Sequence, residues 1–205
     1  MMKLFFSPGA CSLGIHVILE EIGHPYEIEA VNLHQPAAER ALTAVNPKSK
    51  VPTLVRDDGS VLTQWPAIAL WLGRRFPVAH LLPPGPEAEV HAVEQIDYMA
   101  STVHMQGFSR LFNQARFAPS EADAPAVRAQ GLTIVNAGFA LLAAPLATKE
   151  WLLGPYSVAD AALFFLEFWA KVRFALDMPA PIAAHYDRMR ARPTVQAVLR
   201  AEAIA

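Results

Sequence analysis

Strand patterns in this 205-residue chain stop at Pro77, and this constrains the fold more than any other feature. From Pro77 to Pro86 the chain carries four prolines and a glycine, a composition typical of a linker. Beyond it, the periodic segments have helical spacing. The sequence therefore predicts an α/β domain, a linker and an all-helical domain, at residues 1–77, 78–86 and 87–205.

The α/β part alternates strand and helix. Apolar residues at i, i+3, i+4 and i+7 predict a helix that ends at Ile22, and the turn Asp57-Asp58-Gly59-Ser60 predicts a hairpin. A βαβ unit followed by a ββα unit implies a small mixed sheet with helices packed on it. The expected strands are 3–6, 26–31, 53–56 and 61–63, and the expected helices are 13–22, 37–44 and 66–76.

The helical part contains long amphipathic segments and one apolar, aromatic-rich segment. Ser157 and Asp160 have capping-box spacing at the start of the apolar helix, which indicates a folding signal rather than a catalytic site. The expected helices are 87–115, 125–146, 158–176, 182–190 and 194–203, with a polar loop at 118–124.

Composition excludes several classes of function. With 17 basic and 19 acidic residues, the chain gives no reason to expect nucleic acid or an anionic membrane as a partner. A single cysteine rules out an internal disulfide or a multi-cysteine zinc site, and histidines and acids lack metal-ligand spacing. We expect no metal, no apolar run long enough to span a membrane, and a cytoplasmic location.

Cys11, the only cysteine, lies between the first strand and the first helix. Unpaired amides at a helix N-terminus stabilise a thiolate, the reactive form of cysteine. The sequence therefore makes Cys11 a candidate reactive thiol of lowered pKa. The alternative is a small buried residue that fills space.

Two further junctions are candidate binding segments. Val51-Pro52 precedes a strand, and a cis bond there would present the Val51 backbone as a free edge for a peptide; a trans proline in a loop is the alternative. Gln64 and Trp65 precede Pro66 at the start of a helix, whose amides suit either a carboxylate ligand or ordinary capping.

In this order, the segments resemble cytosolic glutathione transferases of the bacterial beta class over nearly the whole chain. The motifs are Ser7-Pro8-Gly9-Ala10-Cys11-Ser12, Asn46-Pro47-Lys48 through Val51-Pro52, and Ser157-Val158-Ala159-Asp160. The resemblance implies a thioredoxin-like N-terminal domain, a C-terminal helical bundle and a homodimer.

The resemblance also implies how glutathione is bound. Cys11 matches the cysteine that contacts the glutathione sulfur or forms a mixed disulfide with it. Val51, before a cis-Pro52, matches the residue whose backbone pairs with the cysteinyl part. Gln64 and Trp65 match the pair that holds the γ-glutamyl end.

In the helical part, His104 matches a histidine that faces the active site, which makes it a candidate catalytic residue with Cys11. Trp169 matches an aromatic side chain that lines the second-substrate pocket, and Phe108 and Phe112 are its expected neighbours. Met105 stands where some relatives carry a lysine.

Three other positions depart from the family pattern. Phe6 stands near the place of the catalytic tyrosine of other classes, which excludes a tyrosine mechanism there. Gln64 replaces a glutamate, and Trp65 replaces a small residue and adds bulk. Asp97 is a candidate to reach across a dimer interface and supply the negative charge that Gln64 lacks.

Two functions follow as hypotheses. The first is an enzyme that transfers glutathione, as its thiolate, to a small hydrophobic electrophile, with thiol–disulfide chemistry at Cys11 left open. The second is a non-catalytic binding or regulatory protein on the same fold, which Trp65 would favour if it blocked the γ-glutamyl site.

Overall fold

The computed structural model describes residues 1–32 and 36–204. The chain forms two compact units, Met1–Leu82 joined by the chain from Asp187 onward, and Pro83–Tyr186. The sequence pattern grouped residues 87–205 together, whereas the C-terminal segment groups with the first unit. Helical periodicity predicts that a helix has an apolar face, but it does not predict which unit that face packs against.

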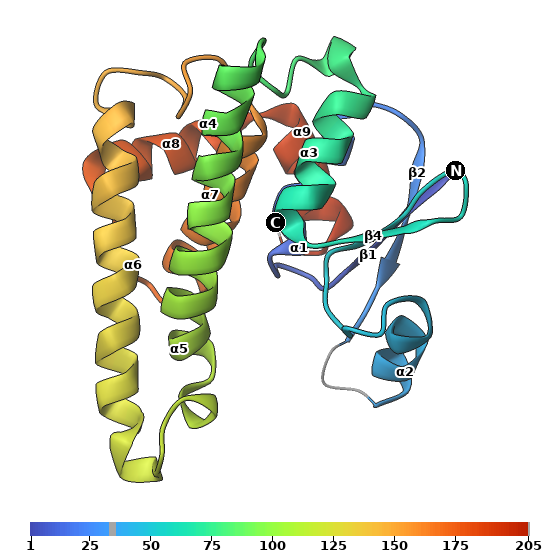
Figure 1. The fold of residues 1–205 in the computed structure, drawn as a ribbon. Helices are drawn as coiled ribbons and strands as arrows, with labels where there is room; N and C mark the ends of the chain where they lie inside the picture. The colour runs from blue at the N-terminus through green and yellow to red at the C-terminus, as the bar shows by residue number, and fades with distance from the viewer. Residues whose placement is uncertain (33–35, 205) are drawn as a thin grey trace. The chain divides into compact units, whose positions relative to one another are not determined.

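A four-stranded sheet of order β2-β1-β3-β4 forms the centre of the first unit. The strands are β1 Met2–Phe6, β2 Tyr26–Ala30, β3 Thr53–Val55 and β4 Val61–Thr63. β1 runs parallel to β2 and antiparallel to β3, which is antiparallel to β4 (Figure 1). Leu4 lies opposite both Ile28 and Leu54. This is the mixed sheet that the order of the sequence elements predicted.

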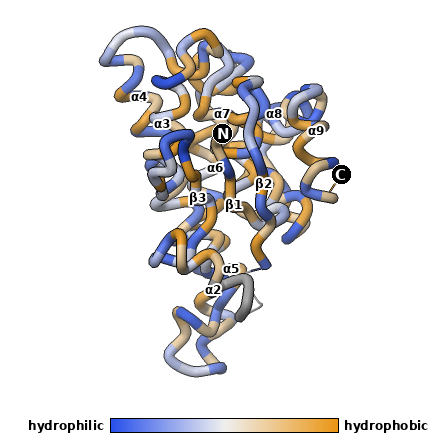
Figure 2. The backbone as a smooth tube through the Cα atoms, turned by 90° about the vertical axis from the view of Figure 1, so that its right-hand side faces the viewer, coloured by the Kyte–Doolittle hydropathy of each residue, from blue (hydrophilic) through white to orange (hydrophobic). Residues whose placement is uncertain are grey.

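The helices of this unit are α1 Ser12–Ile22, α2 Pro36–Val45, α3 Trp65–Arg75, a 3-10 turn at Pro77–Ala79, and α9 Pro193–Ala201. Helix α1 packs against both α3 and α9, and its side chains Ile15, Ile18 and Leu19 are fully buried. The hydrophilic edge strand β2 lies beside β1 in Figure 2, with its acidic side chains paired to Lys3. The core of the unit therefore lies around α1 and β1.

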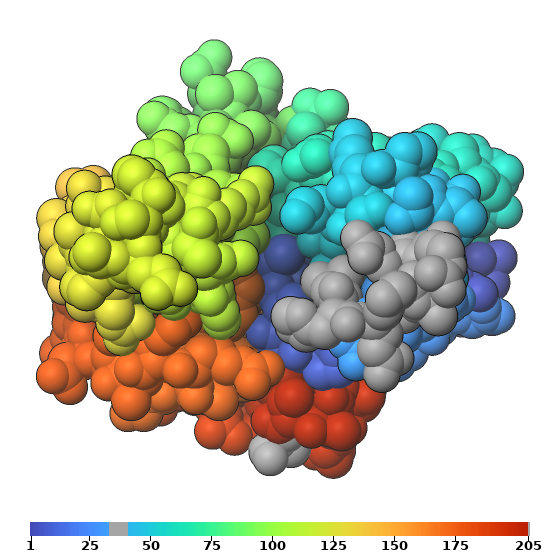
Figure 3. All heavy atoms as spheres, turned by 90° about the horizontal axis from the view of Figure 1, so that it is seen from below, coloured from blue at the N-terminus to red at the C-terminus, as the bar shows by residue number. Residues whose placement is uncertain are grey.

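Polar and apolar contacts hold the C-terminal segment to the N-terminal helix. Arg192 donates from Nε and Nη2 to the two carboxylate oxygens of Glu21 on α1, at 2.8 Å each. Val195, Val198 and Leu199 of α9 are buried. Figure 3 shows the C-terminal residues in red beside the N-terminal residues in blue. The two ends of the chain thus form one core.

The second unit is helical. Its elements are α4 Pro86–Asp97, the π-helical segment η2 Tyr98–Phe108, α5 Ser109–Phe112, short 3-10 turns Gln114–Arg116 and Glu121–Asp123, α6 Ala124–Leu146, α7 Val158–Phe168, the π-helical segment η5 Trp169–Arg173, and α8 Ala180–Ala191, which crosses the unit boundary. Helix α6 packs closely along η2. A Cβ on Gly138 of α6 would lie 2.6 Å from Cγ2 of Val103, so only glycine fits there.

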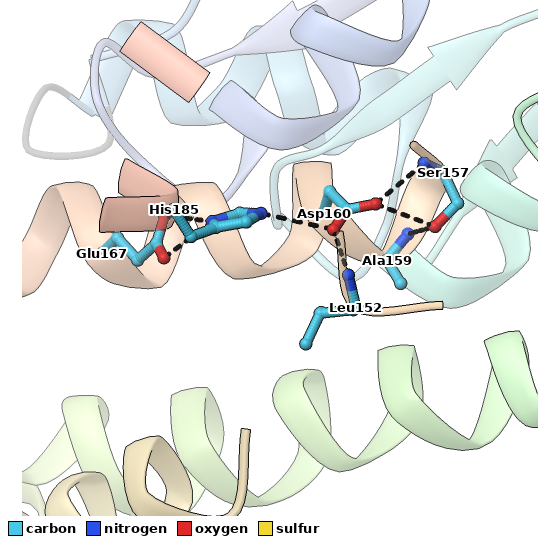
Figure 4. A network of polar contacts seen from close by, with 6 residues as sticks. All are labelled: Leu152, Ser157, Ala159, Asp160, Glu167 and His185. Atoms are coloured by element: carbon cyan, nitrogen blue, oxygen red, sulfur yellow. Dashed lines mark hydrogen bonds and ion pairs between the residues drawn. The ribbon is translucent and has the colours of Figure 1, made fainter. Parts of the chain in front are cut away.

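A buried histidine joins α8 to α7 (Figure 4). His185 Nδ1 lies 2.8 and 3.0 Å from the carboxylate oxygens of Glu167, and its Nε2 lies 3.2 Å from Oδ1 of Asp160. Asp160 also accepts from the backbone N–H and the hydroxyl of Ser157, which confirms the predicted capping box. Both ring nitrogens face carboxylates, so the ring is held as the doubly protonated imidazolium.

Burial opposes the charge on His185, but the charges and hydrogen bonds of Glu167 and Asp160 outweigh it and raise its pKa to about 9. Because the pKa is higher in the folded state, protonation stabilises the fold fully below the ordinary value of about 6.5, and this stabilisation is lost as pH rises through about 9.

We expect His185→Gln to lower the free energy of unfolding by about 3 kcal/mol more at pH 6 than at pH 10. Denaturant titrations of both proteins across this range measure the difference. His91→Gln, at an exposed histidine, is the matched control and should show no such trend. A cost for His185→Gln that is equal at both ends of the range would contradict the charged buried histidine.

Candidate functional site

The turn from β1 to α1 is held by its own hydroxyl group. Ser12 Oγ accepts from the Ser7 N–H at 3.2 Å and lies 3.3 Å from the Ser7 carbonyl oxygen, to which it donates. Gly9, at φ 65°, provides the left-handed conformation that the turn requires. Cys11 follows as the N-cap residue of α1, the place that the sequence predicted.

A carboxylate from the other end of the chain fixes the same turn. Oε2 of Glu202, just beyond α9, accepts the Gly9 N–H at 2.8 Å, and Oε1 lies 2.8 Å from Nδ1 of His16 on α1. The Glu202 side chain is fully buried. Sequence reasoning missed this contact because the partners are almost the whole chain apart and no local pattern marks them.

The Cys11 thiol does not have the lowered pKa that the sequence predicted. Sγ is partly buried and donates to the carbonyl oxygen of Val51 at 3.3 Å. Burial raises the pKa of Cys11 to about 12, against the opposing effects of the Cys11 and Ser12 amides and the charge of Lys50. The expected lowering of the pKa of Cys11 was wrong, because loss of hydration on burial outweighs the effect of the helix start.

The Val51–Pro52 bond is cis. Asn46, which is buried, donates from Nδ2 to the Lys50 carbonyl oxygen at 3.0 Å and to Thr53 Oγ1 at 2.9 Å. Its Oδ1 accepts the Lys48 N–H at 3.1 Å. Asn46 therefore shapes the loop that presents Val51. Asn46 lies in one of the motifs that resemble the family, but no local pattern in the sequence indicates this role.

The start of α3 is unusual in backbone and side chain. Gln64 has φ 76° and ψ 125°, a conformation that costs free energy for a residue with a Cβ and is often found at functional sites. Trp65 is 5 % exposed, and its Nε1–H donates to the Cys11 carbonyl oxygen at 3.0 Å. The indole therefore packs inward, and it ties the start of α3 to the Cys11 turn.

In the second unit, the predicted pocket residues form one aromatic cluster. His104 and Phe108 lie on η2, Phe112 on α5 and Trp169 on η5. The Trp169 ring centroid lies 4.8, 5.4 and 5.1 Å from those of His104, Phe108 and Phe112. Phe108 and Trp169 are buried, whereas Phe112 is 49 % exposed. Phe112 is thus the ring that this cluster presents to solvent.

The structure brings the predicted residues together in two groups. Within the first unit, Cys11 contacts Val51 and Trp65. Within the second, His104, Phe108 and Phe112 each contact Trp169. Asp97, the last residue of α4, is exposed and has no ring contact with them. Among residues 1–32 and 41–204, whose side chains the structure describes, no group of three or more His, Cys, Asp or Glu side chains is placed to hold a metal.

Comparisons with known proteins agree with this arrangement. Residues 8–75 match the model of the glutathione S-transferase N-terminal domain. The chain is 37 % identical over 211 residues to glutathione S-transferase GstA of Escherichia coli O157:H7, with 99 % of this chain and 100 % of the relative covered. The chain belongs to the glutathione S-transferase family.

Solved structures extend the match to the helical unit. A bacterial beta class glutathione S-transferase of Sphingomonas chungbukensis has a TM-score of 0.85 at 33 % identity, covering 99 % of this chain and 100 % of that one. A sphingomonad glutathione S-transferase complexed with glutathione gives the same TM-score, identity and coverage. The predicted thioredoxin-like domain with a helical domain, and the resemblance to the bacterial beta class, are confirmed.

We expect a plot of the Cys11 alkylation rate against pH to have its inflection above about pH 8.5, which is the pKa of an ordinary cysteine, because burial keeps the thiol neutral. Iodoacetamide labelling across a pH series, followed by mass spectrometry, measures it unambiguously because Cys11 is the sole cysteine. Lys50→Gln removes a charge that favours the thiolate and should move the inflection further up. A plateau below pH 8 would show a lowered pKa instead.

Proposed function

We propose that this protein binds glutathione at the Cys11, Val51 and Trp65 group and conjugates its thiolate to small hydrophobic electrophiles. The observation that carries this is the pair of hydrogen bonds that joins three elements at Cys11, from Sγ to Val51 and from the Trp65 indole to the Cys11 carbonyl. A relative with 33 % identity over nearly the whole chain was solved with glutathione bound.

The ligand chemistry suits this group. Glutathione is peptide-like in its middle, so its cysteinyl part pairs with the backbone at Val51 beside cis-Pro52. Its γ-glutamyl carboxylate lies against the amides at the start of α3, beside Gln64. The indole of Trp65 is buried and hydrogen-bonded to the Cys11 carbonyl, which supports an accessible γ-glutamyl position beside Gln64. This weakens the alternative of a non-catalytic binding or regulatory protein.

The state of Cys11 favours conjugation over thiol–disulfide exchange. A thiol held neutral by burial is a poor nucleophile but a hydrogen-bond donor. We assign it the role of donating to the glutathione sulfur, which stabilises the glutathione thiolate. In conjugation the thiol proton of glutathione goes to solvent, the sulfur attacks the electrophilic carbon, and the leaving group departs with its electron pair.

The aromatic cluster of the second unit is the proposed contact surface for the electrophile. Phe112 provides the exposed ring, while Phe108 and Trp169 support it from the interior. His104, whose ring packs edge-on against Trp169, is the candidate polar group of this surface. Met105, where some relatives carry a lysine, is 44 % exposed and extends the apolar surface instead.

A homodimer accounts for an uncovered apolar helix. Contrary to the expectation from the sequence, one segment, Glu121–Leu146, mostly α6, is long and apolar enough by length and composition to cross a membrane, and only 33 % of its most apolar window is buried. Leu141 on this helix is 64 % exposed. We propose that a second copy of the chain covers this face. Across this dimer, Asp97 supplies a carboxylate to the glutathione ammonium.

We also propose that the protein works in the cytoplasm and needs no metal.

Two measurements test the function. Calorimetry should detect glutathione binding at millimolar concentration or tighter, and the protein should conjugate glutathione to 1-chloro-2,4-dinitrobenzene with release of chloride. Cys11→Ala should lower this activity about tenfold through the loss of one charge-assisted hydrogen bond, without abolishing it. Ser109→Ala, at an exposed hydroxyl outside the Cys11 group, should leave glutathione affinity unchanged.

Absence of glutathione binding would refute the proposal. Binding without conjugation would favour the non-catalytic alternative. Complete loss of activity in Cys11→Ala, with affinity retained, would instead assign Cys11 a covalent role.

A further inference from the structure

The aromatic cluster of the second unit opens to solvent at a surface rich in apolar atoms. Phe112 on α5 is 49 % exposed and Val172 on η5 is 51 % exposed. The Phe112 ring lies 4.7 Å from the Phe174 ring and 5.1 Å from the Trp169 ring, edge to face in both cases. An aromatic ligand fits such a surface, because a further ring gains the same edge and face contacts.

Positively charged side chains lie on the elements that carry these rings and on the neighbouring helix α6. The guanidinium carbon of Arg128 on α6 lies 6.0 Å from the Phe174 ring centroid. Arg110 on α5 lies 4.6 Å from the Phe117 ring and donates to the Gln106 carbonyl oxygen, and Arg116 lies 5.9 Å from the same ring. Lys171 lies on η5, between Trp169 and Val172.

In the part of the chain that the structure describes, Arg110, Arg116, Arg128 and Lys171 have no ion pair with an acidic side chain. Asp123, an acid on the turn before α6, is engaged in the capping box with Ser120. Among the described residues, no carboxylate is therefore paired directly with these four charges. An arginine stacked on an aromatic ring keeps its N–H donors available for an anion in the plane of the guanidinium.

We propose that the electrophile is an aromatic anion, whose ring packs on Phe112 while its carboxylate pairs with Arg128. This rests on the proposed function and narrows its substrate class from hydrophobic electrophiles in general to planar aromatic acids. The apolar rings provide affinity for the ring system, and the arginine distinguishes the acid from a neutral analogue of similar shape.

Two chlorodinitroarenes of nearly equal shape test the proposal. 4-Chloro-3,5-dinitrobenzoate carries a carboxylate, whereas 4-chloro-3,5-dinitrobenzamide is neutral, and with both substrates the glutathione sulfur forms a bond to the ring carbon as chloride leaves. Each kcat/KM is divided by the rate constant of the uncatalysed reaction. The acid should be preferred about fivefold at low salt, as expected for one partly exposed ion pair. High salt should reduce this preference.

Arg128→Gln should bring the preference close to one by lowering kcat/KM for the acid. Arg200→Gln, at an exposed arginine on α9 of the first unit, is the matched control and should keep the preference. A wild-type preference near one, or a preference that survives Arg128→Gln, would overturn the inference while conjugation of either substrate still supports the proposed function.

Binding of dinitroarenes tests the anionic site even if the protein turns over neither substrate. If neither substrate is conjugated, the proposed function fails. Calorimetry with 3,5-dinitrobenzoate and with 3,5-dinitrobenzamide then measures the same preference. Tighter binding of the acid to the wild type than to Arg128→Gln supports the anionic site, and equal binding refutes it.

Discussion

The rest of the proposed glutathione site depends on one buried carboxylate, that of Glu202. The carboxylate accepts a hydrogen bond from the Gly9 N–H and forms another with His16. The turn before Cys11 is therefore fixed by the C-terminal segment as well as by Ser12 within the turn. A buried amide that loses its acceptor costs about 1–3 kcal/mol. The C-terminal segment therefore belongs to the site, and its packing against α1 serves to position that carboxylate.

From this turn, a chain of hydrogen bonds orders the other elements. Cys11 donates from Sγ to Val51, whose loop is shaped by Asn46, and receives the Trp65 indole at its carbonyl. The contacts of Cys11 with Val51 and Trp65 also exclude water from the thiol, and this loss of hydration keeps the thiol neutral. In the proposed mechanism, Cys11 is thus a donor to the glutathione sulfur, and the negative charge resides on the ligand.

Local signals in the sequence were enough to predict much of this. The strand and helix order, the hairpin at Gly59 and the cap at Ser157 each depend on residues close in sequence, and all three are confirmed. The contact of Glu202 with Gly9 and the grouping of α9 with the first unit depend on long-range packing. The pKa of Cys11 depends on burial by distant segments, and the π-helical form of η2 has no sequence signature.

Calorimetric titration with glutathione of two variants tests this account most directly. Glu202→Ala leaves the Gly9 amide unpaired and should weaken binding at least tenfold, with Glu202→Gln, which keeps an acceptor, recovering part of the loss. Glu21→Ala removes the contacts of α1 with Arg192 and Thr194 without touching the turn, and this variant should bind glutathione as the wild type does. Unchanged affinity in a folded Glu202→Ala protein, or an equal loss in both alanine variants, would contradict the role of Glu202 in positioning the Cys11 turn.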